Sequence, residues 1–559
     1  MKIKNLYKMM AGAFLLAAAS QGLTGCSDTW DDHYEMAGTN GSSSLLQMIE
    51  ENPQLSDFYE LLRSTHIYNN NHRTKVTYAD LLNADQALTV WAPVNGTFNI
   101  DSLLDLCQTE KGDSTVGRHF VMNHIAHNLY NMNAQTDESV KMLNDKFLPL
   151  AYRSLYNAKI VDEQHVNTPA TNGLLHVVND DAWYTYNVYE AITSLDEFRH
   201  LGSFLSRYEK QELDEERSIQ SGIEDGKKVY SDSVMVKTNN LFRVFDQIMD
   251  EDSTFFMLVP DADTWKPVYD EAATFFNFAP IEKGDSICDY WTHVSLMSDL
   301  IYNENVQRSM NDSIFSTSYR MYDWPYHVFH YPYEEGGLLN SSNMKDELQC
   351  SNGRIMRIKE WPFTPEDLFF RPVVMQGERE ANLIDYKDCT FNYRAAVGDT
   401  ISGNAYLDIV PKNTTTNWEA TFEVRNTLSA TYDICAVILP KTVYKSNSHD
   451  FKPNKFKAEL TYMDENGEMQ TVKFDDEVTT NGMKVDTVRI GRFTFPVCNY
   501  QQQDATVNLK LISSVGRRET SYSREMFLDC IYLKPVSDED SSDEELENKE
   551  ANERKEAKK

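Results

Sequence analysis

The chain has 559 residues, a formal net charge of −33 and 41% hydrophobic residues, with 12% aromatic residues. This length exceeds what one hydrophobic core supports, so we expect about three or four globular domains, and the composition argues against a disordered chain. The acidic charge repels phosphate backbones and therefore argues against nucleic acid as a partner.

Residues 1–25 have the pattern of a targeting segment. Three lysines precede a short apolar run at 9–19, which is shorter than the roughly 20 residues that cross a bilayer. The segment ends in Leu-Thr-Gly-Cys at 23–26 and resembles the lipobox of bacterial lipoproteins, in which the cysteine takes lipid and becomes the N-terminus. We expect lipid on Cys26 to hold the chain to a membrane; a plain secreted protein is the alternative.

The tether after Cys26 is acidic. Its first residues, Ser27 to Asp32, resemble the surface-export signal of Bacteroidota lipoproteins, which implies the outer leaflet of the outer membrane, facing outward. An ordinary acidic tether is the alternative. Glycine, serine and threonine near its end make the tether, 26–42, a flexible spacer before the fold.

Two sets of landmarks recur along the chain. Helical periodicity at 45–62, broken by Pro53, returns at 195–205, where Ser194 and Glu197 have capping-box spacing. One landmark is an apolar strand that ends at a proline and is followed by a polar turn, and it occurs at Thr89–Phe98 and again at Phe256–Trp265. Another is an Asn-Gly turn that starts a strand, and it occurs at Asn172–Val178 and again at Asn352–Ile358. The recurrence predicts two copies of one domain, at 43–184 and 185–375, the second with insertions.

These landmarks resemble the two sequence blocks of fasciclin (FAS1) domains. Val140–Asn144 resembles the middle strand of that family, and Asn123-His124 lies where the family often has Tyr-His. In the second copy Phe256 replaces the threonine of the first block and Met356 replaces the histidine. The resemblance implies a compact α/β module, a β-wedge packed by helices, used mostly in adhesion and extracellular binding.

The region 376–535 alternates between apolar and polar residues in short segments, which predicts an antiparallel β-sandwich and an α+β chain overall. The segments are Ala405–Val410, Trp418–Arg425, Tyr432–Leu439, Phe456–Tyr462, Val488–Phe495, Ala505–Ile512 and Phe527–Leu533. Asn466-Gly467 predicts a hairpin with a type I′ turn. The last segment resembles the final strand of galactose-binding-like jelly rolls, and we expect the charged tail, 536–559, to be disordered or a frayed helix.

Seven cysteines follow Cys26, and none forms a CxxC pair, which argues against a zinc ribbon or a redox motif. Most lie among apolar residues, so we expect buried thiols; one disulfide in the C-terminal region is the alternative.

Two groups of residues could bind metal. His119, His124 and His127 are close in sequence, and a helix would place the last two on one face; hydrogen-bonded packing is the favoured alternative. Asp261 and Asp263 form a DxD pair that lacks the further oxygens of a Ca²⁺ loop, so we expect them to cap a turn.

An aromatic segment, Tyr319–Tyr333, falls in an insertion of the second copy. Its rings could stack on sugars or prolines, which makes Tyr322, Trp324, Tyr326 and Tyr331 candidate ligand-binding residues. Packing of the loop onto its own domain is the alternative.

No hydrolase elbow, P-loop, dinucleotide fingerprint or HExxH motif occurs in the sequence. We therefore expect a non-catalytic surface lipoprotein without a cofactor, which binds a glycan or peptide as an accessory to nutrient uptake by a SusC/SusD-type transporter. An adhesin or protein-assembly module is the first alternative, and an unrecognised hydrolase is the second.

Overall fold

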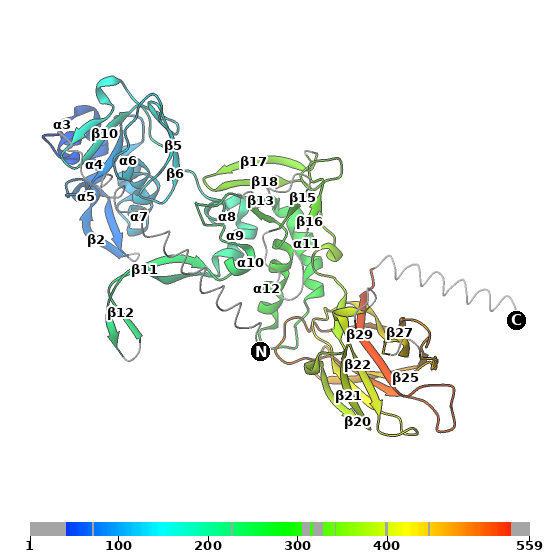
Figure 1. Cartoon of the computed structure of the whole chain (residues 1–559). Coiled ribbons are helices and arrows are strands. Elements are labelled where there is room, and N and C mark those ends of the chain that lie inside the picture. The colour runs from blue at the N-terminus through cyan, green and yellow to red at the C-terminus, as the bar shows by residue number, and fades with distance from the viewer. Residues whose placement is uncertain are drawn as a thin grey trace, which may run out of the picture.

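The computed structural model describes residues 41–69, 72–224, 227–303, 313–316, 328–340, 342–396, 401–444 and 448–537. Cys26, the tether up to residue 40 and the tail from residue 538 lie outside this range. The described residues form three bodies that follow one another in chain order, with a long two-stranded ribbon projecting from the middle one (Figure 1). We call the bodies the first module, the second module and the C-terminal domain.

The first module alternates helices and strands. Its helices include the two predicted around Pro53, which begins a short 3-10 helix between them and so produces the break in periodicity. Its elements are α3 (Leu45–Glu51), η1 (Pro53–Leu55), α4 (Ser56–Ser64), β1 (His66–Asn69), β2 (His72–Thr77), α5 (Tyr78–Leu82), β3 (Leu88–Pro93), α6 (Ile100–Leu106), α7 (Glu110–His119), η2 (Val121–His124), β4 (Ile125–His127), β5 (Asp137–Lys141), β6 (Phe147–Ala151), β7 (Ser154–Leu155), β8 (Ala158–Lys159), η3 (Glu163–His165), β9 (Thr168–Ala170) and β10 (Gly173–Val178).

The second module repeats this order with longer insertions. Its elements are α8 (Val188–Ser194), η4 (Asp196–Phe198), α9 (Arg199–Ser206), β11 (Glu209–Glu224), β12 (Lys227–Asn239), α10 (Phe242–Phe245), β13 (Phe255–Pro260), α11 (Ala262–Phe275), α12 (Gly284–Met297), β14 (Ile301–Asn303), β15 (Ser313–Phe315), β16 (Val328–His330), β17 (Met344–Cys350), β18 (Gly353–Ile358) and α14 (Pro365–Leu368). The ribbon β11–β12 comes after the second helix of its module, where the first module has the short hairpin β1–β2.

The two modules have four-stranded sheets of the same topology. The strand orders are β4-β3-β10-β9 and β14-β13-β18-β17, and in each the two central strands are parallel. The register is also the same, because the pairing starts at the glycine of the Asn-Gly landmark and ends at the proline of the other landmark. The two sheets therefore share one topology and one register; the predicted domain duplication and the fasciclin resemblance stay predictions.

The asparagine of each Asn-Gly landmark ties the module together. Asn172 accepts a hydrogen bond from Leu45 N (2.9 Å) and donates to the carbonyls of Leu82 (2.9 Å) and Ala84 (2.8 Å). Asn352 repeats all three bonds, with Val188 N (2.8 Å) and with the carbonyls of residues 248 (3.0 Å) and 250 (2.9 Å). The landmark recurs because one side chain joins the first helix of the module to the loop before its central strand.

The glycine of each landmark is required by close backbone approach. A Cβ on Gly173 would lie 2.0 Å from Leu88 O, and one on Gly353 would lie 1.7 Å from Phe255 O. Gly353 also has φ +141°, which a residue with a Cβ rarely adopts.

The capping box expected at Ser194 and Glu197 is wrong. Ser194 is the last residue of α8, and the 3-10 helix that follows has no side-chain cap. The box instead forms one helix earlier, where the Asn187 side chain accepts from the Glu190 backbone and the Glu190 side chain accepts from the Asn187 backbone.

The C-terminal domain is an antiparallel β-sandwich, as predicted, and each of the seven predicted segments overlaps a strand. One sheet has the order β21-β22-β29-β24-β27, with β19 pairing β29, and the other has the order β20-β23-β28-β25-β26. The elements are β19 (Val373–Gln376), η5 (Glu380–Asn382), β20 (Leu383–Lys387), β21 (Cys389–Ala395), η6 (Ser402–Asn404), β22 (Ala405–Pro411), β23 (Glu419–Glu423), β24 (Thr431–Leu439), η7 (Lys441–Val443), β25 (Lys455–Met463), β26 (Met469–Thr479), β27 (Asp486–Thr494), β28 (Asn508–Ser513) and β29 (Met526–Pro535). The expected boundary at 375–376 falls inside β19.

The hairpin β25–β26 is present, but its turn is not type I′. Gly467 has φ +81°, whereas Asn466 is not among the residues with positive φ, and a type I′ turn needs both. Asp464 explains the difference, because its carboxylate accepts hydrogen bonds from Asn466 N (2.9 Å) and Glu468 N (2.9 Å) and so holds a longer loop.

The modules are joined in two different ways. The second module and the C-terminal domain share one hydrophobic core, whereas the first module has separate cores. At the shared core, Trp291 meets Tyr500 edge to face at 4.9 Å between ring centroids, and Asn277 Nδ2 donates to Pro496 O (2.8 Å).

Buried charge joins the first module to the second. Lys146, 1% exposed, donates to Glu190 Oε2 (2.7 Å), Glu251 Oε1 (2.6 Å) and Ser351 Oγ (3.0 Å). Arg118 Nη2 lies 2.8 Å from Glu190 Oε1. Burial would raise the pKa of Glu190, but Lys146 and Arg118 together hold that pKa below its usual range.

Candidate functional site

The expected aromatic site lies mostly outside the described residues. This applies to Tyr322, Trp324 and Tyr326. Tyr331 is described and is 56% exposed, with φ +49°. The expected aromatic binding site therefore stays a prediction.

The histidine group does not converge on one point. His124 is fully buried; its Nδ1 is 2.8 Å from Phe120 O and its Nε2 accepts from Ala182 N at 2.9 Å, so backbone groups occupy both ring nitrogens. Burial lowers the pKa of His124 to about 4, which keeps the ring neutral. His119 stacks on Tyr184 at 4.0 Å, and His127 is exposed. The packing role expected of His124 is confirmed.

Asp261 precedes α11, but its carboxylate does not cap the helix and instead lies 2.7 Å from Lys345 Nζ. The expectation that this side chain caps the turn is therefore wrong, because the carboxylate forms an ion pair with Lys345 of β17 instead. The seven described cysteines are all free thiols, and five of them are buried. In the described part of the chain, no three His, Cys, Asp or Glu side chains gather in a way that could hold a metal ion. No helix there is both long and apolar enough to span a membrane.

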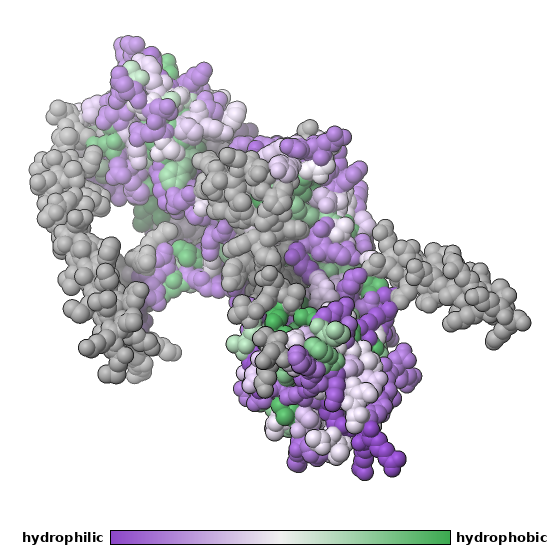
Figure 2. Space-filling view, turned by 45° about the vertical axis from the view of Figure 1, so that its right-hand side comes forward, coloured by the Kyte–Doolittle hydropathy of each residue, from purple (hydrophilic) through white to green (hydrophobic). Residues whose placement is uncertain are grey.

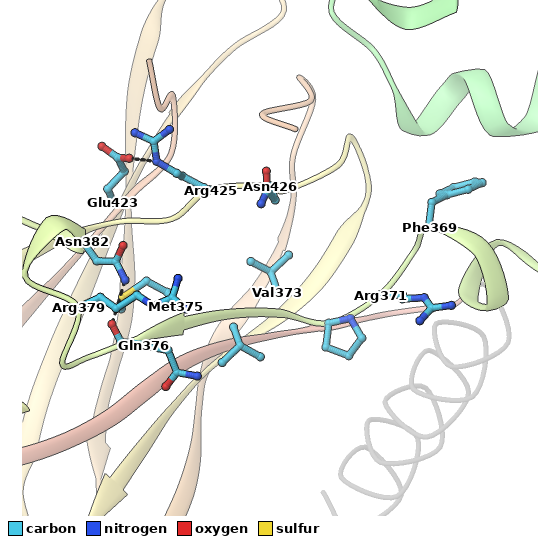
Figure 3. A pocket seen from close by; sticks show the side chains of 12 residues that line it. Phe369, Arg371, Val373, Met375, Gln376, Arg379, Asn382, Glu423, Arg425 and Asn426 are labelled. Atoms are coloured by element: carbon cyan, nitrogen blue, oxygen red, sulfur yellow. Dashed lines mark hydrogen bonds and ion pairs between the residues drawn. The ribbon is translucent and has the colours of Figure 1, made fainter. Parts of the chain in front are cut away.

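A trough opens where β19 enters the C-terminal domain. Its volume is about 510 Å³, and it is lined by Phe369, Arg371, Pro372, Val373, Val374, Met375, Gln376, Arg379, Asn382, Glu423, Arg425 and Asn426. Figure 3 shows Phe369 and Arg371 at one end, Val373 in the middle, and Arg379 and Arg425 at the other end. This volume is in the range of small-molecule sites.

Backbone groups orient the polar side chains of the trough. Arg371 Nη2 donates to Asp367 O, and Asn382 Nδ2 donates to Gln376 O (2.9 Å). Arg425 pairs with Glu423 through Nε, and its Nη1 reaches the carbonyls of residues 502 (3.2 Å) and 503 (3.4 Å). Side chains fixed in this way offer hydrogen bonds at a low cost in entropy.

Beside the trough, the sandwich is open along one edge. The strands β20 and β21 each form one edge of their sheet, and β26 and β27 form the other edges. Tyr386 lies opposite the fully buried Ala420, and Tyr393 lies opposite the fully buried Leu407. Residues directly opposite in an antiparallel pair face the same side of the sheet, so both tyrosines face the interior side. They nevertheless remain 57% and 44% exposed, because nothing described covers this edge.

Ring contacts bridge the open edge between the two sheets. Tyr386 meets Phe391 of the other sheet edge to face at 5.0 Å. Burial raises the pKa of Tyr393, and the charges of Glu380 and Tyr386 raise it further, so these groups are near neighbours. Glu380 comes directly after Arg379 of the trough, so the trough lies near this edge. We call the exposed edge formed by β20 and β21, together with the trough, the open edge.

Further polar side chains lie next to the trough. Asp529, 1% exposed, accepts from Ser402 N (3.1 and 3.2 Å), and burial raises its pKa to about 6. A Cβ on Gly403 would lie 2.5 Å from Glu378 Oε1 and 3.4 Å from Gln376 Oε1.

Figure 2 shows the hydropathy of one face of the molecule. On the face shown, the C-terminal domain is largely hydrophilic, and its hydrophobic side chains gather at the end nearest the second module.

Comparison with known proteins gives only distant structural neighbours. No protein-family model matches the chain, and no curated protein matches it. The solved structures similar to it include a Clostridium thermocellum xylanase fragment with a CBM22 module in complex with xylohexaose (12% identity, 30% of this chain and 29% of that chain, TM-score 0.20). Two others are a xylan-binding CBM22 domain from Paenibacillus barcinonensis (11% identity, 30% and 94%, TM-score 0.20) and a family 35 carbohydrate-binding module from C. thermocellum (10% identity, 30% and 99%, TM-score 0.18). At these TM-scores the likeness carries no argument about function.

Proposed function

We propose that this protein is a non-catalytic extracellular lipoprotein that binds a glycan at the open edge of its C-terminal domain. The observation that carries the proposal is the exposure of Tyr386 and Tyr393, two rings on the core-facing side of their strands. Aromatic faces stack on the apolar faces of sugar rings, and tyrosine hydroxyls add hydrogen bonds. The trough beside them supplies amide and guanidinium donors for sugar oxygens.

The test is glycan binding by the full-length protein, measured on an array and then by calorimetry. Tyr386→Ala and Tyr393→Ala should each weaken binding at least about fivefold, since a ring contact contributes about 1 kcal/mol beyond buried area. Tyr152→Ala is the matched control, because that ring is 53% exposed in the first module and lies outside both candidate aromatic groups. Equal affinities of all three variants and the wild type would reject the open edge as the site.

The membrane anchor and the transporter partnership belong to the same proposal. The lipobox-like segment before Cys26 supports an anchor, and the acidic residues after it support display on the cell surface. Protease treatment of whole cells should remove the protein, and Cys26→Ser should leave it unlipidated. Co-purification with a SusC/SusD-type transporter tests the accessory role in uptake.

The ribbon β11–β12 favours protein assembly as a second candidate function. Among the described strands, β11 and β12 pair only with each other, so each has an edge with unpaired backbone groups. Such edges accept strands from other proteins. A complex that forms without glycan and is lost when the ribbon is shortened to the length of β1–β2 would support assembly.

A further inference from the structure

We propose that the ligand of the open edge is an acidic glycan with carboxylate groups on more than one sugar. This inference rests on the proposed function and specifies its ligand class. Its basis is the set of arginines that line the trough.

The lining of the trough is rich in arginine, although the protein is acidic. Its lining has three guanidinium groups, from Arg371, Arg379 and Arg425, and one carboxylate, from Glu423, whereas the chain as a whole has a net charge of −33. A cluster of arginines is the common way to bind carboxylates, because the planar guanidinium matches two carboxylate oxygens at once.

Arg425 is preorganised for such a contact. Its Nε is paired with Glu423, and its Nη1 reaches two backbone carbonyls, so one side of the guanidinium is fixed. Among the described residues Nη2 has no acceptor, while the side chain remains 50% exposed. A carboxylate of the ligand would complete the hydrogen bonding of this group.

The spacing of the arginines favours a ligand with repeated charge. Arg371 lies at one end of the trough, and Arg379 and Arg425 lie at the other, with the apolar side chain of Val373 between them (Figure 3). From Arg371 to Gln376 the extended chain spans roughly 16 Å, at about 3.3 Å per residue. A single carboxylate cannot reach both ends. A polyuronate can place carboxylates at the ends and a sugar face against Val373.

Exposed tyrosines favour a glycan over an acidic peptide. Tyr386 and Tyr393 are exposed rings, and Tyr393 is close enough to Glu380, the residue after Arg379, to feel its charge. Flat rings at this position suit the faces of further sugar units, whereas a peptide rich in acidic side chains has no such face.

The experiment compares acidic glycans with matched neutral ones on the full-length protein. The probes are polygalacturonate, alginate and glucuronoxylan, each with its carboxyl-reduced neutral form, and poly-glutamate. We expect at least one polyuronate to bind at least tenfold more tightly than its neutral form, with affinity that falls as salt rises. Arg425→Gln and Arg379→Gln should each remove most of this preference, and Arg518→Gln, an exposed arginine outside the trough lining, should not.

The outcomes separate this inference from the proposed function. Equal binding of acidic and neutral forms, with no effect of the arginine substitutions, overturns the carboxylate inference and leaves glycan binding intact. If poly-glutamate binds through the same arginines and no glycan does, the ligand is an acidic peptide and the proposed function fails too. Binding of neutral glycans that is lost in Tyr386→Ala but kept in Arg425→Gln also overturns the inference.

Discussion

Lys146→Met tests the buried charge that joins the first two modules. The substitution keeps the aliphatic stem and removes an ammonium group that donates to Glu190, Glu251 and Ser351. Both carboxylates are mostly buried, with side chains 14% and 12% exposed, so the variant leaves negative charge without its main partner. Removing one member of a buried ion pair costs about 3–5 kcal/mol, and we expect a loss of this size in the free energy of unfolding.

The measurement is urea unfolding followed by tryptophan fluorescence and by limited proteolysis of the segment 180–187 between the modules. Lys141→Met is the control, because Lys141 pairs with Asp145 on the surface at 3.3 Å, with both side chains at least half exposed, and should cost less than about 1 kcal/mol. Adding Glu251→Gln to Lys146→Met should recover part of the loss, since Arg118 still neutralises Glu190. A loss below about 1 kcal/mol for Lys146→Met, with no new cleavage between the modules, would refute the reasoning.

Three further predictions concern stability. Burial lowers the pKa of His176 to about 4, from an ordinary 6.5, so between these pH values the unfolded chain binds a proton that the folded chain does not. The free energy of unfolding should therefore fall by up to roughly 3 kcal/mol as the pH drops from about 6.5 to 4. His176→Met, which introduces the residue found at the equivalent position 356, should flatten this pH dependence in thermal melts, and an unchanged slope would contradict the prediction. Burial raises the pKa of Asp529 to about 6, so the stability that this group contributes is full below about pH 4 and is lost as the pH rises through 6. Asp529→Asn should therefore be more stable than the wild type at pH 7, by up to about 3 kcal/mol, and equal to it at pH 4. The opposite order would show that the ionised carboxylate is the stabilising form. Gly353→Ala should lower the free energy of unfolding by about 3 kcal/mol or more, because the new Cβ would overlap Phe255 O. Gly336→Ala, at φ +80° with nothing within 4 Å of the new Cβ, should lower it by about 1 kcal/mol. Similar midpoints of urea unfolding for the two variants would exclude the backbone clash as the cause.

Sequence patterns were sufficient where a local rule determines the structure. Period-2 alternation predicts the strands of the sandwich, and the Asn-Gly landmark predicts the repeat because one asparagine and one glycine perform the same task in each copy. Local rules gave wrong predictions at two positions. The capping box expected at Ser194 is absent because Ser194 ends a helix, and the type I′ turn expected at Asn466 is absent because the Asp464 side chain holds a longer loop.

Alternation could not predict the open edge. Tyr386 and Tyr393 have the pattern of ordinary core positions, and their exposure depends on which strands form the edges of the two sheets, which is a property of the whole sandwich. The trough collects residues from 369–382 and 423–426, and their approach depends on the pairing of β20 with β23.

The shared core of the second module and the C-terminal domain changes where the protein can be divided. Apolar side chains from Val188 to Leu533 belong to one cluster, whereas the first module keeps cores of its own. The first two modules therefore differ in how they are connected to the rest of the protein. The first module has its own cores and contacts the second through buried ion pairs, whereas the second module shares its core with the sandwich. A fragment cut in the segment 180–187 should be soluble and folded on both sides, while a cut near residue 375 would expose the inside of a single core.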